Sequence, residues 1–196
     1  MSPLLRQPLS VEHALLGFLN ERPMHGYEIH QRLAGLAGLG LAWQVKQSHL
    51  YAMLDKLEQD GYITGKQQTQ DMRPPRRVFR LTNAGRKAFR DWLGRPVAHG
   101  REVRLEFMAK LYFAQQEGSD LVIELVAGQR VECELWRKRL LEQAEASGAE
   151  RGSFEWLVYQ FRVGQVESML AWLTLCAETG TLAAAPASPR GSEPAS

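Results

Sequence analysis

The sequence predicts a mainly α-helical fold that contains one two-stranded β-hairpin. Apolar residues recur every three or four positions through most of the chain, which is the spacing of a buried helix face. Two strand-like segments, 62–66 and 76–82, flank a polar link that contains two prolines. A linker with Gly and Pro, 94–102, then precedes three longer helical segments. The order of elements therefore predicts a small N-terminal domain with a hairpin, followed by a helical domain.

Two helices are predicted at the start of the chain. The first spans about 11–20 and is stopped by Pro23, because proline cannot continue a helix interior. The second spans about 26–36, and the Gly-rich segment 34–42 that follows is predicted to be a turn or loop. The core candidates of the second helix are Tyr27, Ile29 and Leu33.

The third predicted helix begins at Gln47 or Ser48 and ends before Gly61. Its apolar residues share one face and are expected to be buried: Leu50, Met53, Leu54 and Leu57. The opposite face carries Ser48, His49, Ala52, Asp55, Lys56 and Gln59, with Tyr51 on its flank. Apart from the acidic Asp55, these side chains can approach a phosphate backbone and base edges without steric or charge penalty.

The hairpin and a fourth helix complete the N-terminal domain, which is predicted to span residues 1–95. The link 67–75 is expected to form a long flexible tip, and Thr82 is expected to cap a helix over 83–93. The apolar stripe of that helix is Ala84, Ala88, Phe89 and Trp92. Three helices, a hairpin and another helix are the order of a winged helix-turn-helix, whose third helix enters the major groove of DNA.

The charge distribution favours an anionic partner for this domain. Residues 1–95 hold 14 Lys and Arg against 8 Asp and Glu, whereas residues 96–196 hold 10 against 14. Basic residues cluster on the hairpin, where the only acid is Asp71. The predicted contacts to double-stranded DNA are Ser48, His49, Tyr51, Ala52, Lys56, Lys66, Arg73, Arg76 and Arg77. For the hairpin, the alternative is a basic surface that is merely solvated. For the whole protein, the alternative is a winged-helix protein–protein adaptor without sequence-specific DNA binding.

The C-terminal half is predicted to form a helical dimerisation domain over 96–180, with helices at about 102–116, 119–145 and 154–178. The last helix has a coiled-coil-like seam: Trp156, Tyr159, Val163, Val166, Leu170 and Leu173. A second apolar stripe contains Leu157, Phe161 and Trp172. A helix that is apolar on two sides needs two partners, which indicates a homodimer; burial within one subunit is the alternative. The tail 181–196 is rich in Ala, Pro and Ser and is predicted to be disordered.

Other classes of protein find little support in the sequence. Cys133 and Cys176 are the only cysteines and have no metal-ligand spacing, which fits a reducing cytoplasm. We expect no membrane span, no secretion signal, no metal site, no cofactor and no enzymatic activity, because the corresponding motifs are missing. Trp92 and Trp156 are candidates to line a pocket for a small effector, although packing is the commoner role of tryptophan.

Three segments closely resemble the PadR family of bacterial transcriptional regulators: ALLGFLNERPMHGYEIHQRL, SHLYAMLDKLEQDGYIT and RRVFRLTNAGRKAFRDWL. The resemblance covers about residues 11–93, and a looser one extends to the longer C-terminal subgroup through 101–114 and 167–173. It implies a homodimeric repressor that binds an inverted-repeat operator and can be released by a small aromatic or apolar effector. It also implies that Ser48, Tyr51 and the basic residues of the hairpin meet the DNA backbone.

Overall fold

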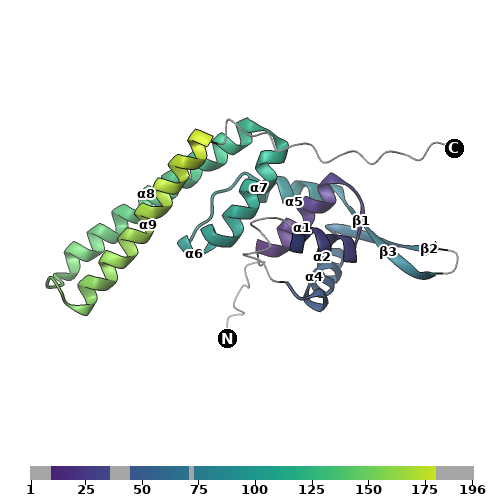
Figure 1. Cartoon of the computed structure of the whole chain (residues 1–196), viewed down its shortest axis with the longest axis horizontal. Coiled ribbons are helices and arrows are strands. Elements are labelled where there is room, and N and C mark those ends of the chain that lie inside the picture. Colours follow the sequence, from purple (N-terminus) through teal and green to yellow (C-terminus); the bar gives the residue numbers. More distant parts are fainter. Residues whose placement is uncertain (1–9, 36–44, 71–72, 180–196) are drawn as a thin grey trace. The chain divides into compact units, whose positions relative to one another are not determined.

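The computed structural model describes residues 10–35, 45–70 and 73–179, and describes side chains there except at 10–11, 69–70 and 73–76. The chain divides into two compact units, Met1–Phe113 and Ala114–Ser196 (Figure 1). The predicted tail 181–196 and most of the predicted loop 34–42 lie outside the described residues. Each unit is described below by itself.

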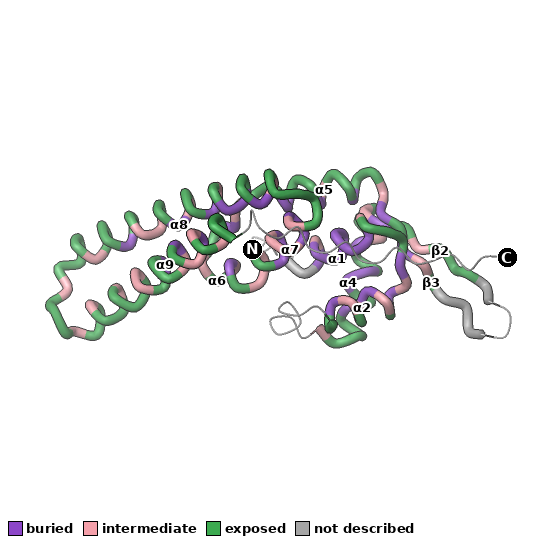
Figure 2. Tube along the Cα trace, turned by 45° about the horizontal axis from the view of Figure 1, so that its top comes forward, coloured by how far each residue is buried: buried purple, intermediate pink, exposed green. Residues whose placement is uncertain are grey.

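The helices of the first unit follow the predicted spans. They are α1 (Ser10–Glu21), α2 (Gly26–Gly35) and α4 (Gln47–Gln59). The four apolar residues predicted to form the inner face of α4 are buried (Figure 2). Tyr27 was expected in the core and is 54% exposed; Gly26, at the start of α2, is buried in its place.

The sheet of the described residues has three strands rather than two. They are β1 (Met24–His25), β2 (Ile63–Gln70) and β3 (Arg73–Leu81), in the order β1-β3-β2 and all antiparallel. β1 was not predicted, because two residues are too short to show a strand period; Met24 pairs with Phe79 and is buried.

The hairpin is also longer than its sequence indicates. β2 and β3 remain paired as far as Gln70 and Arg73, so most of the link predicted over 67–75 is strand (Figure 1). This part of β2, Lys66–Gln70, contains only polar residues and therefore has no apolar alternation. A register shift between Gln68 and Gln70 interrupts the pairing near the tip.

Helix α5 (Asn83–Leu93) begins at a close contact with Tyr62, the residue that precedes β2. Thr82 caps it as predicted, because its Oγ1 accepts a hydrogen bond from the Gly85 amide at 3.0 Å. A Cβ atom at Gly85 would lie 2.1 Å from the Tyr62 carbonyl oxygen, so this position has room only for glycine. The predicted stripe is correct at Phe89 and Trp92 but wrong at Ala84, which is exposed while Gly85 is buried.

The first unit extends beyond the predicted boundary at residue 95. A short helix α6 (Gly100–Glu102), a π-helical turn η1 (Val103–Phe107) and α7 (Met108–Glu117) replace the single helix expected over 102–116. The Phe113 ring packs edge-on against Phe18 and Phe89, with centroids 5.3 and 5.5 Å apart. Gly17 admits this ring, since a Cβ there would lie 2.5 Å from it. Aromatic packing of Phe113 therefore holds the part of α7 in the first unit to α1 and α5.

The second unit is a pair of long helices, α8 (Ser119–Ser147) and α9 (Phe154–Thr179). Gly148, in the left-handed conformation with φ of 62°, ends α8. The seam predicted for a dimer lies against α8 of the same chain: Val166, Leu170 and Leu173 are buried, and Trp156, Tyr159 and Val163 are half-buried. The alternative of burial within one subunit therefore applies to Val166, Leu170 and Leu173, and the role of the whole seam in a subunit interface stays a prediction.

We predict that Gly85→Ala lowers the free energy of unfolding by about 1–3 kcal/mol, because the new methyl group must push the Tyr62 carbonyl away. Gly94→Ala is the matched control, since a Cβ at Gly94 finds its nearest neighbour at 3.6 Å, an ordinary contact. Urea denaturation of both variants measures the difference. Equal midpoints would contradict the close approach of α5 to Tyr62.

Candidate nucleic-acid interface

The outer face of α4 presents small polar side chains to solvent. Ser48, His49 and Ala52 are all exposed in its first turns, as predicted. Lys46 occupies the N-cap position without a side-chain cap, so Ser48 belongs to the first turn. Because the Lys46 side chain does not cap this end, its amide groups and the positive end of the helix dipole can receive an anion such as a phosphate.

Tyr51 lies at the contact between α4 and the start of α2. Its side chain is 37% exposed, and a Cβ atom at Gly26 would lie 2.7 Å from its Cε1 atom. A glycine at position 26 therefore allows the Tyr51 ring to rest on α2 while its edge faces solvent. Tyr27, which follows Gly26 in the chain, is exposed, and its hydroxyl accepts a hydrogen bond from the Gln31 side chain at 2.8 Å. Its exposure was not predicted, because Tyr27 was expected to pack in the core with Ile29 and Leu33.

Lys56, predicted to contact DNA, is engaged inside the first unit. Its Nζ atom lies 3.0 and 3.2 Å from the two carboxylate oxygens of Glu12 on α1. The Glu12 side chain is only 9% exposed, so a buried carboxylate depends on this partner. Lys56 therefore stabilises the packing of α4 on α1, a role that spacing in the sequence did not reveal.

The basic residues of the hairpin differ in their surroundings. Lys66 is exposed on β2 and makes no ion pair within the part of the chain that the structure describes. Arg73 and Arg76 belong to β3, where they pair with Gln70 and Gln68, but their side chains lie outside the described set. Arg77 forms ion pairs with two acids of α4: Asp55, at 3.1 Å, and Glu58. These pairs link the hairpin to α4.

Trp92 lies in a buried polar cluster of the first unit. Its Nε1–H donates to Glu106 at 2.8 Å, the His13 ring stacks on it at 5.7 Å, and the Lys110 ammonium lies 5.2 Å from its centroid. Lys110 is 2% exposed and donates to the Arg95 carbonyl at 2.7 Å. The cluster joins α1, α5, η1 and α7, and Trp92 contributes to their packing.

Burial lowers the pKa of two cluster members. Desolvation lowers the pKa of His13, against the opposing charges of Glu106 and Glu12. Desolvation likewise lowers the pKa of Lys110, against Glu106. The second tryptophan candidate, Trp156, is half-buried on α9 in the other unit.

The described residues contain neither a metal-binding cluster nor a membrane-spanning helix. No group of three His, Cys, Asp or Glu side chains within residues 10–35, 45–70 and 73–179 is arranged to hold a metal ion. Over the same ranges, no helix combines the length and apolar character needed to span a bilayer.

Residues 15–91 match the model of the transcriptional regulator PadR-like family. They contain α4, the hairpin and most of α1 and α5. Over these residues the chain is similar to the PadR-like family. A curated relative, the negative transcriptional regulator PadR of Bacillus subtilis, is 34% identical over 115 residues. These residues make up 57% of this chain and 62% of the relative.

A second curated protein and a solved structure are also similar to this chain. A probable transcriptional regulator of Mycobacterium tuberculosis, Rv1176c, is 25% identical over 49% of this chain and 50% of its own length. The chain thus spans about half to three fifths of the length of these two curated relatives. Among solved structures, Bacillus subtilis PadR with operator DNA is 24% identical, with a TM-score of 0.43. The likeness covers 87% of this chain and 98% of that one.

We predict that the free energy of unfolding decreases as the pH falls below about 6.5, the ordinary pKa of histidine. A lowered pKa in the folded state means that the unfolded chain binds the proton more readily in this range, so acid favours unfolding. His13→Gln should remove this part of the dependence. The measurement is urea denaturation at several pH values between about 5 and 8. An unchanged profile in the variant would contradict the burial of a neutral His13.

Proposed function

We propose that this protein is a DNA-binding transcriptional regulator, acting as a homodimeric repressor at an inverted-repeat operator. The observation that carries the proposal is the exposed, uncapped start of α4, with its small polar side chains, within a PadR-like domain. The hairpin beside it adds Lys66, Arg73 and Arg76 as contacts to phosphate. The name of the Bacillus subtilis relative, a negative regulator, supports repression. Such a protein would act in the cytoplasm, where its DNA is.

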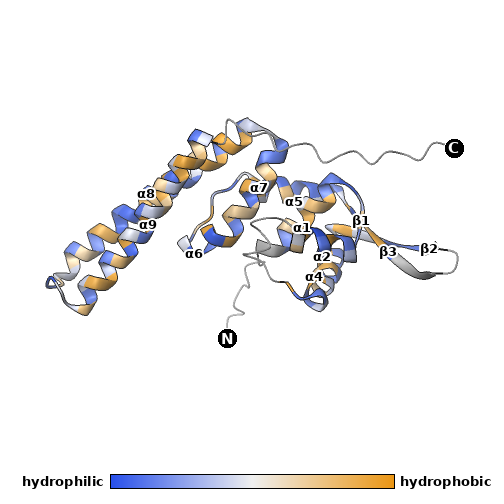
Figure 3. Cartoon of the chain, in the orientation of Figure 1, coloured by the Kyte–Doolittle hydropathy of each residue, from blue (hydrophilic) through white to orange (hydrophobic). Residues whose placement is uncertain are grey.

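Exposed apolar side chains on the second unit support the dimer. Phe154, Leu157, Val158 and Phe161 lie on one face of α9 at helical spacing and are 82%, 51%, 38% and 66% exposed. On α8, Val131, Leu135 and Leu141 are exposed and border a shallow hollow of about 860 Å³. Apolar and polar residues recur along the ribbons of both α8 and α9 (Figure 3). All residues that line this hollow belong to α8, so it is an open helix face rather than an enclosed pocket.

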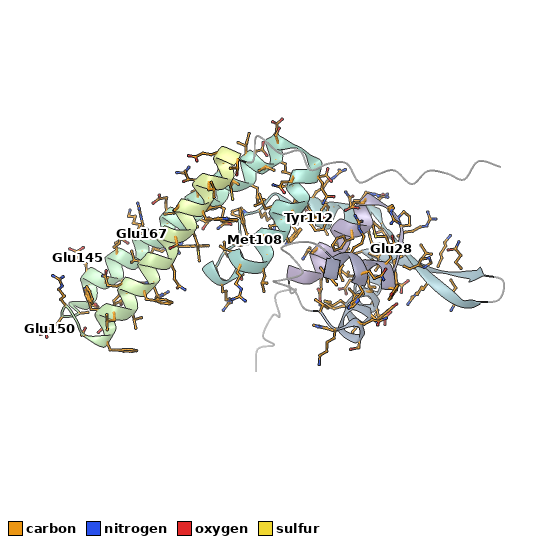
Figure 4. The ribbon with its side chains drawn as sticks, viewed as in Figure 1. Glu28, Met108, Tyr112, Glu145, Glu150 and Glu167 are labelled. Carbon is orange, nitrogen blue, oxygen red and sulfur yellow. The ribbon has the colours of Figure 1, made fainter. Side chains whose placement is uncertain are left out.

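Charged side chains border the apolar face of α8, for example Glu145 (Figure 4). An apolar centre with a polar rim is the usual composition of a subunit interface. In a dimer of this kind the two α4 helices would reach successive major-groove faces roughly 34 Å apart. We place this interface on the face of α9 that carries Phe154, Leu157, Val158 and Phe161, rather than on the seam that includes Val166.

We further propose that a small aromatic or apolar effector modulates DNA binding. Bacillus subtilis PadR has been crystallised with p-coumaric acid, and we extend only this class of ligand to the present chain. Trp92 and Trp156 remain the candidates, although Trp92 is already packed and hydrogen-bonded. An effector can release the operator only if it binds the DNA-free state more tightly.

We predict that Ala52→Glu abolishes selective binding to DNA from the region upstream of the protein's own gene, because a carboxylate on the outer face of α4 would meet phosphate and base edges. Ala146→Glu, at an exposed position of α8, is the matched control and should bind like the parent. Electrophoretic mobility shift with a scrambled competitor is the measurement. A parent protein that shows no sequence preference would indicate the protein–protein adaptor instead.

We predict that Phe161→Glu converts the dimer to a monomer, because it places a charge in the apolar face of α9. Gln160→Glu changes the neighbouring exposed residue by the same charge and should leave the dimer intact. Sedimentation velocity at several protein concentrations distinguishes the two states. A dimeric Phe161→Glu variant would exclude this face from the interface.

A further inference from the structure

We propose that Arg77 is a positioning residue that holds the hairpin against α4 and neutralises its acids, and that it does not contact phosphate itself. This inference rests on the proposed function, because it concerns how the domain presents itself to DNA. It separates Arg77 from the other basic residues of the hairpin, with which the sequence groups it.

The Arg77 guanidinium has several partners within the first unit. Its Nη1 lies 3.1 Å from Asp55 Oδ1, and its Nη2 pairs with Glu58 Oε2. The guanidinium also lies 5.2 Å from the centre of the Phe79 ring. Two carboxylates and an aromatic face thus engage the group that would otherwise reach for phosphate.

Glu58 extends the connection from α4 to β2. Its Oε1 accepts a hydrogen bond from the Gly65 amide at 2.7 Å. β2 is an edge strand, so amides that point away from β3 need partners outside the sheet. Asp55, Glu58, Gly65 and Arg77, here called the Arg77 cluster, therefore connect α4 to both strands of the hairpin.

Gly65 provides the space in which the Arg77 side chain runs. A Cβ atom at this position would lie 2.4 Å from Arg77 Nε and 3.1 Å from Glu58 Oε1. The cluster therefore depends on the absence of a side chain at Gly65 as well as on its three charged residues. A substitution at Gly65 can displace the guanidinium without removing its charge.

The cluster also resolves an electrostatic difficulty at the interface. Asp55 is exposed on the outer side of α4, between the turns that carry Ala52 and Gln59, and its carboxylate would repel phosphate. Arg77 lies beside both acids, so the three side chains together carry one negative charge instead of two. Removing Arg77 would restore the repulsion between Asp55 and phosphate, and it would also release the hairpin from α4.

The test compares Arg77→Gln in two backgrounds, the parent and the Asp55→Asn/Glu58→Gln variant, by fluorescence anisotropy with operator DNA. In the parent background we expect a loss of affinity of about tenfold. In the second background Arg77→Gln should cost little, because the acids that Arg77 neutralises and bridges are absent. An equal or larger cost there would overturn the proposal.

Gly65→Ala provides a second test that retains the arginine charge. It should weaken operator binding as much as Arg77→Gln does, while Gly94→Ala, where a Cβ has ordinary contacts, should bind like the parent. If Gly65→Ala bound normally while Arg77→Gln did not, Arg77 would act on DNA directly. Thermal unfolding of each variant verifies that the fold is retained.

Amide hydrogen exchange separates this proposal from the proposed function. In the absence of DNA, Arg77→Gln should speed exchange of the Gly65 amide, because Glu58 loses the partner that orients it. Unchanged exchange would overturn the cluster even if the parent binds DNA. A parent that fails to bind any operator would overturn the proposed function, and faster exchange would still support the cluster.

Discussion

The burial of one face of α4 is the constraint on which the rest of the first unit depends. Leu50, Met53, Leu54 and Leu57 are at most 4% exposed, and each contributes about 1.5–3 kcal/mol by leaving water. Because a helix has only one opposite side, this burial determines that Ser48, His49 and Ala52 face solvent. The candidate interface is therefore a consequence of packing.

Charge pairing then decides which basic residues remain available to a nucleic acid. Lys56 forms an ion pair with the buried Glu12, and Arg77 forms ion pairs with Asp55 and Glu58. The excess of positive charge in residues 1–95 consequently overstates the positive charge that α4 can offer. The two pairs fix α4 against α1 on one side and against the hairpin on the other, which suits a helix that must be held rigidly.

The second unit shows the limit of reading apolar periodicity as an interface. The sequence of α9 contains two apolar stripes, and periodicity alone treats them as equivalent. In the structure α8 covers the stripe with Val166, Leu170 and Leu173, while Leu157 and Phe161 of the other stripe stay exposed. Which stripe is internal depends on how a neighbouring helix folds back, and that contact is not encoded in the spacing within α9.

The sequence by itself determined helices α1, α2, α4, α5, α8 and α9, the presence of the hairpin, the Thr82 cap, the inner face of α4 and the resemblance to the PadR family, because these depend on residues close together in the chain or on short motifs. It did not determine the length of the hairpin or the division of 100–117 into α6, η1 and α7. It did not reveal β1, whose two residues become a strand only beside β3. Only the tertiary structure decided the pairs Glu12–Lys56 and Asp55–Arg77, the attachment of Phe113 to the first unit, and the need for glycine at 85. Each of these brings together atoms from separate elements, and their positions are set by the packing of the whole unit rather than by local propensity.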